Sequence, residues 1–176
     1  MAKAYLCFYE KFEHKSEYLD SAKKYLDAYK PETQPAEYIY YAYLKNDFQE
    51  VINLASNAAA PLAEAVTNYQ VGQAYFNLRN LDKSMPYMQK AVNLQPFNLE
   101  YRVKLATIYS LYLNLPEAEK ELIFVTVQNP KFASAWNGLA FGNPFFINVA
   151  AKLFSLPPAF APGMHRKKYG FFKIKK

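Results

Sequence analysis

In the middle of the chain, hydrophobic residues recur every three or four positions, the spacing of one face of an α-helix. Two such runs are separated by Arg79-Asn80, a pair typical of a turn. The first run contains Val71, Ala74, Tyr75 and Leu78, and the second contains Leu81, Met85, Met88 and Val92. The pattern predicts two helices joined by a tight turn, with the first run on the core face.

The same pattern returns further along the chain. Residues 68–78 align with residues 102–112, Pro96 aligns with Pro130, and another step of the same length places Trp136 on Arg102. In the other direction, residues 46–52 match residues 80–85 with one gap, at a nearly equal offset. Repetition at a period of about 34 residues is the signature of stacked supersecondary units, so we expect an array of helix hairpins.

Prolines and small residues mark the limits of each unit. Pro96 and Pro130 are expected to end the second helices, because the residue before a proline disfavours the helical conformation. Pro116 is expected in the first turn of a helix, where its missing N–H has no cost. Three small residues are expected where the two helices of a hairpin cross most closely, namely Gly72, Ala106 and Ala140.

These residues resemble the tetratricopeptide repeat family, whose units are about 34 residues long and end in a proline. The segment Val71-Gly72…Tyr75…Leu78…Ala91…Pro96 carries the pattern. The resemblance implies an all-α, right-handed α-solenoid of antiparallel helix hairpins with an irregular basic C-terminal tail. The expected repeat domain spans residues 1–142, with units at about 3–31, 32–64, 65–98 and 99–132 and a partial unit at 133–142. Residues 143–155 are a candidate capping helix, and 156–176 form a Pro-rich, then basic and aromatic tail.

Composition and motifs speak against catalysis and metal binding. The chain has only five glycines and one cysteine, Cys7, and its two histidines, His14 and His165, are far apart. It contains no glycine-rich nucleotide loop and no recognisable nucleophile or zinc motif. Glu10, Glu13 and His14 are close in sequence, but a solvated helix face explains them better than a metal site. We therefore predict a protein that is not an enzyme and has no cofactor and no metal.

The resemblance implies that the first helices of the hairpins line a concave groove that binds a protein or peptide. Residues of these helices outside the core face are the predicted partner-binding set: Glu37, Tyr40, Tyr43, Tyr69, Gln70, Gln73, Phe76, Asn77, Lys104, Thr107, Asn137 and Phe141. Aromatic rings and amides suit a peptide, and such a neutral groove suits a ligand that is not strongly acidic. An alternative for individual tyrosines is simple packing between repeats.

Charge is distributed unevenly along the chain. The formal net charge is +6, yet no acidic residue follows Glu121. The possible electrostatic tail consists of Arg166, Lys167, Lys168, Lys173, Lys175 and Lys176. Basic and aromatic residues in alternation suit an anionic membrane or nucleic acid, so an adaptor acting through this tail is the alternative function. A solvated terminus is the simpler explanation of the same residues.

The region after Phe132 raises two further questions. Residues 132–151 are uncharged, but three asparagines and Pro144 make a soluble helix end a better interpretation than a membrane span. With no signal peptide recognised, we predict a cytoplasmic protein. The incomplete unit from Trp136 to Gly142 is a candidate surface for self-association. An alternative explanation of the incomplete unit is that the chain is a fragment of a longer repeat array. The sequence does not identify the partner, the pathway or the oligomeric state.

Overall fold

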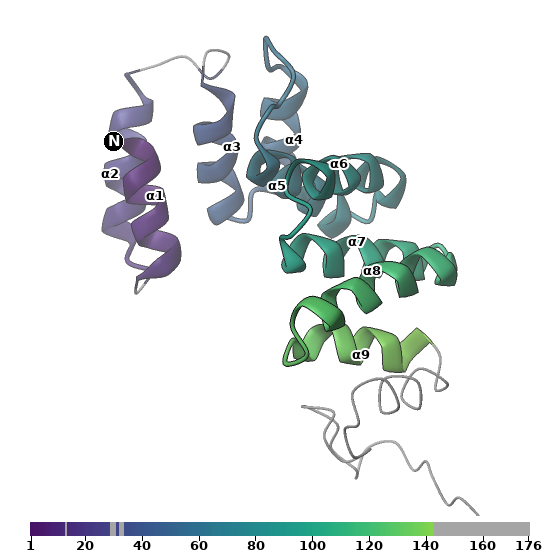
Figure 1. The fold of residues 1–176 in the computed structure, drawn as a ribbon. Helices are drawn as coiled ribbons and strands as arrows, with labels where there is room; N and C mark the ends of the chain where they lie inside the picture. The colour runs from purple at the N-terminus through teal and green to yellow at the C-terminus, as the bar shows by residue number, and fades with distance from the viewer. Residues whose placement is uncertain (13, 29–30, 32–33, 143–176) are drawn as a thin grey trace, which may run out of the picture. The chain divides into compact units, whose positions relative to one another are not determined.

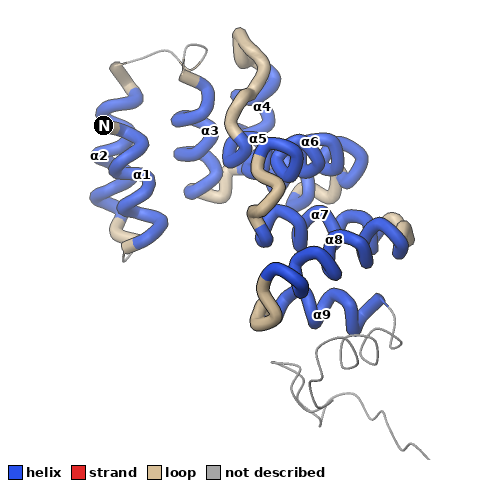
Figure 2. The backbone as a smooth tube through the Cα atoms, in the orientation of Figure 1, coloured by secondary structure: helices blue, strands red, loops and turns tan. Residues whose placement is uncertain are grey.

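The computed structural model describes residues 1–12, 14–28, 31 and 34–142, and the elements within them are helices joined by turns and loops (Figures 1 and 2). The helices are α1 (Ala2–Lys11), α2 (Ser16–Leu26), α3 (Pro35–Leu44), α4 (Phe48–Ser56), α5 (Ala65–Asn77), α6 (Leu81–Leu94), α7 (Leu99–Leu111), α8 (Leu115–Gln128) and α9 (Ala133–Gly142). The chain divides after Tyr101 into two units, 1–101 and 102–176. The predicted capping helix and tail lie outside the described residues.

Unit 1 is built from three hairpins, in which α1 packs on α2, α3 on α4, and α5 on α6. The first helices of these hairpins also contact each other, because α3 packs against both α1 and α5. A row of first helices is thereby formed within unit 1, and residues 99–101 at the start of α7 belong to the same unit. Side chains on these helices can meet across the repeats.

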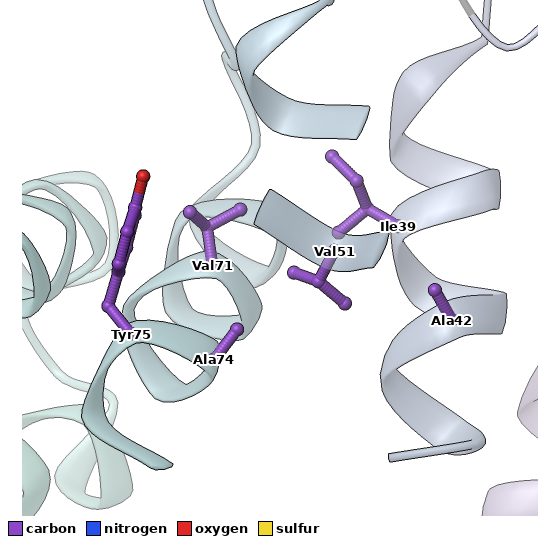
Figure 3. Close-up of a cluster of buried hydrophobic side chains, with 6 residues drawn as sticks. All are labelled: Ile39, Ala42, Val51, Val71, Ala74 and Tyr75. Carbon is purple, nitrogen blue, oxygen red and sulfur yellow. The ribbon is translucent and has the colours of Figure 1, made fainter. Parts of the chain in front are cut away.

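Apolar side chains from two hairpins form the core of unit 1 (Figure 3). Val71 and Ala74 of α5 are completely buried, and they face Val51 of α4. The cluster is completed by Ile39, Ala42 and Tyr75. Burial of Val71, Ala74 and Tyr75 confirms the core face expected from the helical spacing. Removing this apolar surface from water supplies the main force that joins one hairpin to the next.

The crossing of α5 and α6 leaves no room for a side chain at Gly72. A Cβ atom there would lie 3.1 Å from Met88 Cγ and 3.3 Å from the Met88 backbone nitrogen. The Ser84 hydroxyl donates a hydrogen bond of 2.7 Å to the Gly72 carbonyl across the same crossing. The expectation that Gly72 marks the closest approach of the two helices is confirmed.

The turns that join α3 to α4 and α5 to α6 follow one hydrogen-bonding scheme. Asp47 N–H donates to the Ala42 carbonyl, and Asn80 N–H donates to the Tyr75 carbonyl, at 3.0 and 2.9 Å. The residue before each donor has a positive φ, 58° at Asn46 and 63° at Arg79. This is a Schellman ending, in which the donor residue then becomes the N-cap of the next helix. The predicted turn at Arg79-Asn80 is confirmed.

One predicted core residue, Leu78, is 45% exposed, so its assignment to the core was wrong. Leu78 is the C-cap of α5. The backbone there leaves the helical path to enter the Schellman turn, and the side chain no longer follows the apolar face set by the preceding residues. The expected ends of the second helices do hold, because α6 ends at Leu94, just before Pro96.

Unit 2 contains the remainder of α7 together with α8 and α9. Arg102 of α7 forms a salt bridge with Glu121 of α8 and lies over the Phe124 ring, 3.8 Å from its centroid. Leu105 is buried as predicted. Leu122 of α8 packs on α9, where a Cβ on Gly138 would lie 3.0 Å from Leu122 Cδ1.

Two prolines of unit 2 occupy the expected places. Pro116 stands in the first turn of α8, and α8 ends at Gln128, just before Pro130. Tyr109 aligns with the buried Tyr75 of the preceding repeat and was expected in the core on that ground, but it is only partly buried, whereas its neighbour Ile108 is fully buried. Among the helices of the described ranges, none has both the length and the apolar character needed to cross a membrane.

Candidate functional site

Four tyrosines from the first helices of unit 1 form the centre of the candidate site. Tyr40 and Tyr43 belong to α3, Tyr69 belongs to α5, and Tyr101 lies in the first turn of α7. The rings of Tyr69 and Tyr101 stack with centroids 4.5 Å apart and planes inclined by 22°. Stacking at this distance joins α5 to the start of α7 through aromatic surface.

A chain of hydrogen bonds runs from α5 to α7. The Gln73 side-chain amide Nε2 donates to the Tyr69 hydroxyl at 3.0 Å, and this hydroxyl donates to Glu100 Oε1, also at 3.0 Å. A phenol that accepts one hydrogen bond and donates another to a carboxylate is polarised, which strengthens both bonds. The Glu100 carboxylate is therefore held in a fixed orientation beside the stacked rings.

A second carboxylate is held in the same way on the other side of α3. The Tyr40 hydroxyl donates a hydrogen bond to Oε2 of Glu10, which lies at the end of α1. The sequence separation of Glu10 from Tyr40 is 30, and that of Tyr69 from Glu100 is 31. In both cases a tyrosine of one first helix is bound to a glutamate of a neighbouring hairpin's first helix.

The electrostatic influence of these carboxylates connects the two pairs. Burial raises the pKa of Tyr43, and the negative charges of Glu100 and Glu10 raise it further. Burial also raises the pKa of Tyr101, followed by the charges of Glu100 and Glu10. Glu10 of α1 and Glu100 of α7 thus both raise the pKa of a tyrosine on α3, Tyr43.

These seven side chains are hereafter the tyrosine–glutamate cluster: Glu10, Tyr40, Tyr43, Tyr69, Gln73, Glu100 and Tyr101. Burial and the hydrogen bonds to glutamate raise the pKa of both Tyr40 and Tyr69. The phenols therefore stay protonated at neutral pH, as hydrogen-bond donors with ring faces beside them. Tyr69, Gln73 and Tyr101 of the cluster are buried, Tyr40 and Tyr43 are partly buried, and the two glutamates are exposed.

Within unit 1, the predicted partner-binding residues differ in accessibility. Tyr69, Gln70 and Gln73 are only 7%, 3% and 7% exposed, so packing between helices accounts for most of their surface. Glu37, Tyr40, Tyr43 and Phe76 are partly buried, and Asn77 is exposed. The structure brings Tyr40, Tyr43, Tyr69 and Gln73 together in the cluster.

The other predicted residues lie in unit 2 or beyond the described side chains. Lys104 is partly buried on α7, and Thr107 is exposed there and donates to the Val103 carbonyl. Asn137 and Phe141 belong to α9, but their side chains lie outside the described set. The six basic tail residues, Arg166 to Lys176, also fall outside the described part of the chain.

Sequence reasoning missed Glu10, Glu100 and Tyr101. The groove was expected to be neutral, and Glu10 was grouped with its sequence neighbours on a solvated face. Both glutamates are exposed, as expected for Glu10, but each also accepts a hydrogen bond from a tyrosine of a neighbouring hairpin. The sequence does contain a signal for these hydrogen-bond partners, because residues on equivalent helices of successive hairpins are separated by about one repeat length. Pairing each tyrosine with the acidic residues nearly one repeat away finds both partners.

Comparison with known proteins finds similarity both to a family model and to a solved structure. The tetratricopeptide repeat family model matches residues 65–98, which contain α5 and α6. Among solved structures, the chain is similar to YrrB, described as a TPR protein with an unusual peptide-binding site. The alignment has 18% identity and a TM-score of 0.57, and it covers 87% of this chain and 93% of YrrB. Comparison with curated proteins gave no match. The predicted all-α fold of tetratricopeptide type is thus confirmed.

Proposed function

We propose that the chain, which has a fold of the tetratricopeptide type and matches the repeat model over residues 65–98, is a non-enzymatic scaffold that holds a peptide segment of a partner protein. The proposed contact surface is the tyrosine–glutamate cluster of unit 1. YrrB, which shares the fold, is described as having a peptide-binding site, and this favours the same general role here.

One observation carries the proposal: side chains from α1, α3, α5 and α7 converge although they are far apart in the sequence. Tyr40 of α3 donates a hydrogen bond to Glu10 of α1, and Tyr69 of α5 donates one to Glu100 of α7, so each tyrosine reaches another hairpin. Packing of each hairpin requires only its apolar face, so a polar aromatic cluster on the first helices is extra to the fold. Such a cluster is suited to binding.

The half-buried members of the cluster are the best candidates for direct contact. Tyr40 and Tyr43 keep part of their rings accessible, whereas Tyr69 and Tyr101 are more than nine-tenths buried. We assign the first pair to partner contact and the second pair to positioning of Glu100. Hydroxyls and ring faces on α3 would hold the backbone and apolar side chains of an extended peptide.

The test is selection of a random dodecapeptide phage library on the full-length immobilised chain. Tyr40→Ala is expected to weaken binding of the selected peptides by about tenfold, because an accessible tyrosine in a binding surface contributes heavily. Tyr41→Ala is the matched control, since it removes the adjacent ring of the same helix, which lies outside the cluster and faces Lys45.

Circular dichroism melting of both variants accompanies the binding measurements. Equal binding by Tyr40→Ala and the unaltered chain would refute the proposal, as would a library that yields no specific peptide. The two other roles, an adaptor acting through the basic tail and self-association through α9, stay predictions from the sequence. Binding to anionic vesicles or RNA that weakens steeply with salt would favour the first of them.

A further inference from the structure

The two carboxylates of the cluster have no cationic partner among the described residues. The salt bridges there join Lys3 to Glu64, Arg102 to Glu121 and Lys120 to Glu117. Glu10 and Glu100 take part in none of these, although each accepts a tyrosine hydroxyl. Two negative charges thus stand beside aromatic rings, and within the described chain nothing neutralises them.

Each carboxylate has one oxygen in use and one available. Glu100 accepts the Tyr69 hydroxyl through Oε1, and Glu10 accepts the Tyr40 hydroxyl through Oε2. The second oxygen of each group meets no donor in the part of the chain that the structure describes. A carboxylate held by one neutral donor keeps its full negative charge and is pre-oriented to accept a second, charged donor.

We propose that the peptide bound at the tyrosine–glutamate cluster presents lysine or arginine side chains, which pair with Glu10 and Glu100. This inference rests on the proposed function and adds the chemical class of its ligand. The partner segment is basic: its ammonium or guanidinium groups pair with the exposed carboxylates, and its alkyl stems lie on the partly buried rings of Tyr40 and Tyr43.

The aromatic part of the cluster supports the same ligand. A cation over an aromatic face is attracted by the ring as well as by a nearby carboxylate. The chain uses such contacts itself: Lys45 lies over Tyr41 at 5.4 Å from the ring centroid, and Lys83 lies over Tyr75 at 5.8 Å. The long apolar stems of lysine and arginine also cover ring surface while the charged end reaches a carboxylate.

The charges of unit 1 distinguish this ligand from its alternatives. Residues 1–101 contain 12 acidic and 10 basic side chains, so the unit itself repels an acidic peptide weakly. A metal ion is disfavoured because no group of three or more His, Cys, Asp or Glu side chains gathers among the described residues. A neutral peptide would bury two carboxylates without pairing them, at a cost in desolvation.

The experiment tests whether binding depends on the charges of the protein and on those of the peptide. Dodecapeptides are selected from a random phage library on the full-length chain, then synthesised with blocked termini and titrated by fluorescence anisotropy. The test variant is Glu10→Gln/Glu100→Gln, in which each glutamine can still accept the tyrosine hydroxyl. The control is Glu17→Gln/Asp20→Asn, which removes the same charge from exposed positions of α2.

We expect selected peptides to be enriched in lysine and arginine and to bind the test variant about tenfold more weakly than the unaltered chain. The control variant should bind within about twofold of the unaltered chain. Replacing the basic residues of the peptide by glutamine should cost about tenfold on the unaltered chain and little on the test variant. The titration of the glutamine-substituted peptide against the unaltered chain does not depend on the test variant, so this measurement remains valid even if the variant folds poorly.

The possible failures separate the two proposals. Selected peptides without basic enrichment, or with equal affinity for the test variant, overturn the ligand assignment. If those peptides still lose binding to Tyr40→Ala, the proposed scaffold function stands. If no peptide is selected, or if Tyr40→Ala binds as the unaltered chain does, the scaffold function falls and the ligand assignment with it.

Discussion

Substitution of Gly72 by leucine tests the packing of the best-defined hairpin. A leucine Cβ at this position would lie 3.1 Å from Met88 Cγ, 3.2 Å from Met88 Cε and 3.3 Å from the Met88 backbone nitrogen. The side-chain atoms of a methionine can move, but the backbone nitrogen belongs to α6 and moves only with that helix. Three further carbon atoms must then enter a crossing that the Ser84 hydroxyl already holds together.

The expected cost follows from two opposing terms. Overpacking of a filled interior destabilises by about 1–3 kcal/mol, and the backbone contact places this site at the upper end. Leucine is the better helix former by roughly 1 kcal/mol, which offsets part of the loss. The net decrease in the free energy of unfolding is therefore about 2 kcal/mol. With a urea slope of about 2 kcal/mol/M, the unfolding midpoint moves down by about 1 M.

The assay is urea unfolding followed by far-ultraviolet circular dichroism. Ala4→Leu is the control, because it introduces the same side chain at an exposed position of α1 and should leave the midpoint nearly unchanged. Met88→Ala in the Gly72→Leu background should recover part of the loss, since it removes the two movable atoms. A Gly72→Leu midpoint equal to that of the unaltered chain would mean that α5 and α6 do not cross at this residue.

Two further predictions concern a helix cap and alkaline pH. Asn80→Ala should lower the free energy of unfolding by about 1 kcal/mol, because Asn80 Oδ1 accepts the Lys83 N–H at 3.2 Å and so caps α6. The control is Asn114→Ala, at the equivalent turn before α8, where the asparagine side chain makes no capping bond. This substitution should lower the free energy of unfolding by less in the same urea titration. The pKa of Tyr69 is higher in the folded chain than in the unfolded chain. The unfolded chain therefore loses its phenol protons first, above about pH 10. The free energy of unfolding should be unaffected by this group below that pH and should fall above it. Urea midpoints measured from about pH 9 to about pH 11 should show this fall, and Tyr69→Phe should make it shallower, whereas an unchanged slope would contradict the assigned burial.

The parts of the fold that are set by local physics could be predicted from the sequence. A proline disfavours the helical conformation in the residue before it, so the ends of α6 and α8 could be predicted from Pro96 and Pro130, although Pro86 is accommodated within α6. The burial of Val71 follows from helical periodicity, and the crowding at Gly72 follows from its place at a helix crossing. Each of these inferences involves residues within one hairpin.

The candidate site could be predicted only in part, because its key contacts join different hairpins. Tyr40 and Tyr69 were selected as first-helix residues outside the core face, and both are in the cluster. Their partners, Glu10 and Glu100, are fixed by how neighbouring first helices pack and not by the sequence around either residue. Periodicity within one helix gives the direction of a side chain, but it does not say which side chain of the next repeat it meets.

The turn between paired helices explains why the period of the repeat is uneven. The residues with positive φ in these turns are Asn46, Arg79 and Leu113. The interval from Asn46 to Arg79 is one residue shorter than the interval from Arg79 to Leu113. Each of these residues is followed by Asp or Asn, whose N–H closes the Schellman turn. A search for an Asp or Asn at the N-cap locates these turns independently of the spacing. What recurs along the chain is the turn, and the repeat length varies around it.

The repeats also show how different side chains can perform one structural role. Asn68 and Trp136 occupy the same place in the alignment of the repeats, and each donates a hydrogen bond to a carbonyl of the preceding loop, on Leu62 and Pro130 respectively. Arg102, between them in the alignment, uses its charge to reach Glu121 on the paired helix. An amide, an indole and a guanidinium are all planar donors of N–H groups. The position therefore requires a donor and not a particular residue, so sequence identity between repeats understates their structural likeness. Glu10 and Glu100 form no such bond within a hairpin, since each accepts a tyrosine hydroxyl from a neighbouring hairpin.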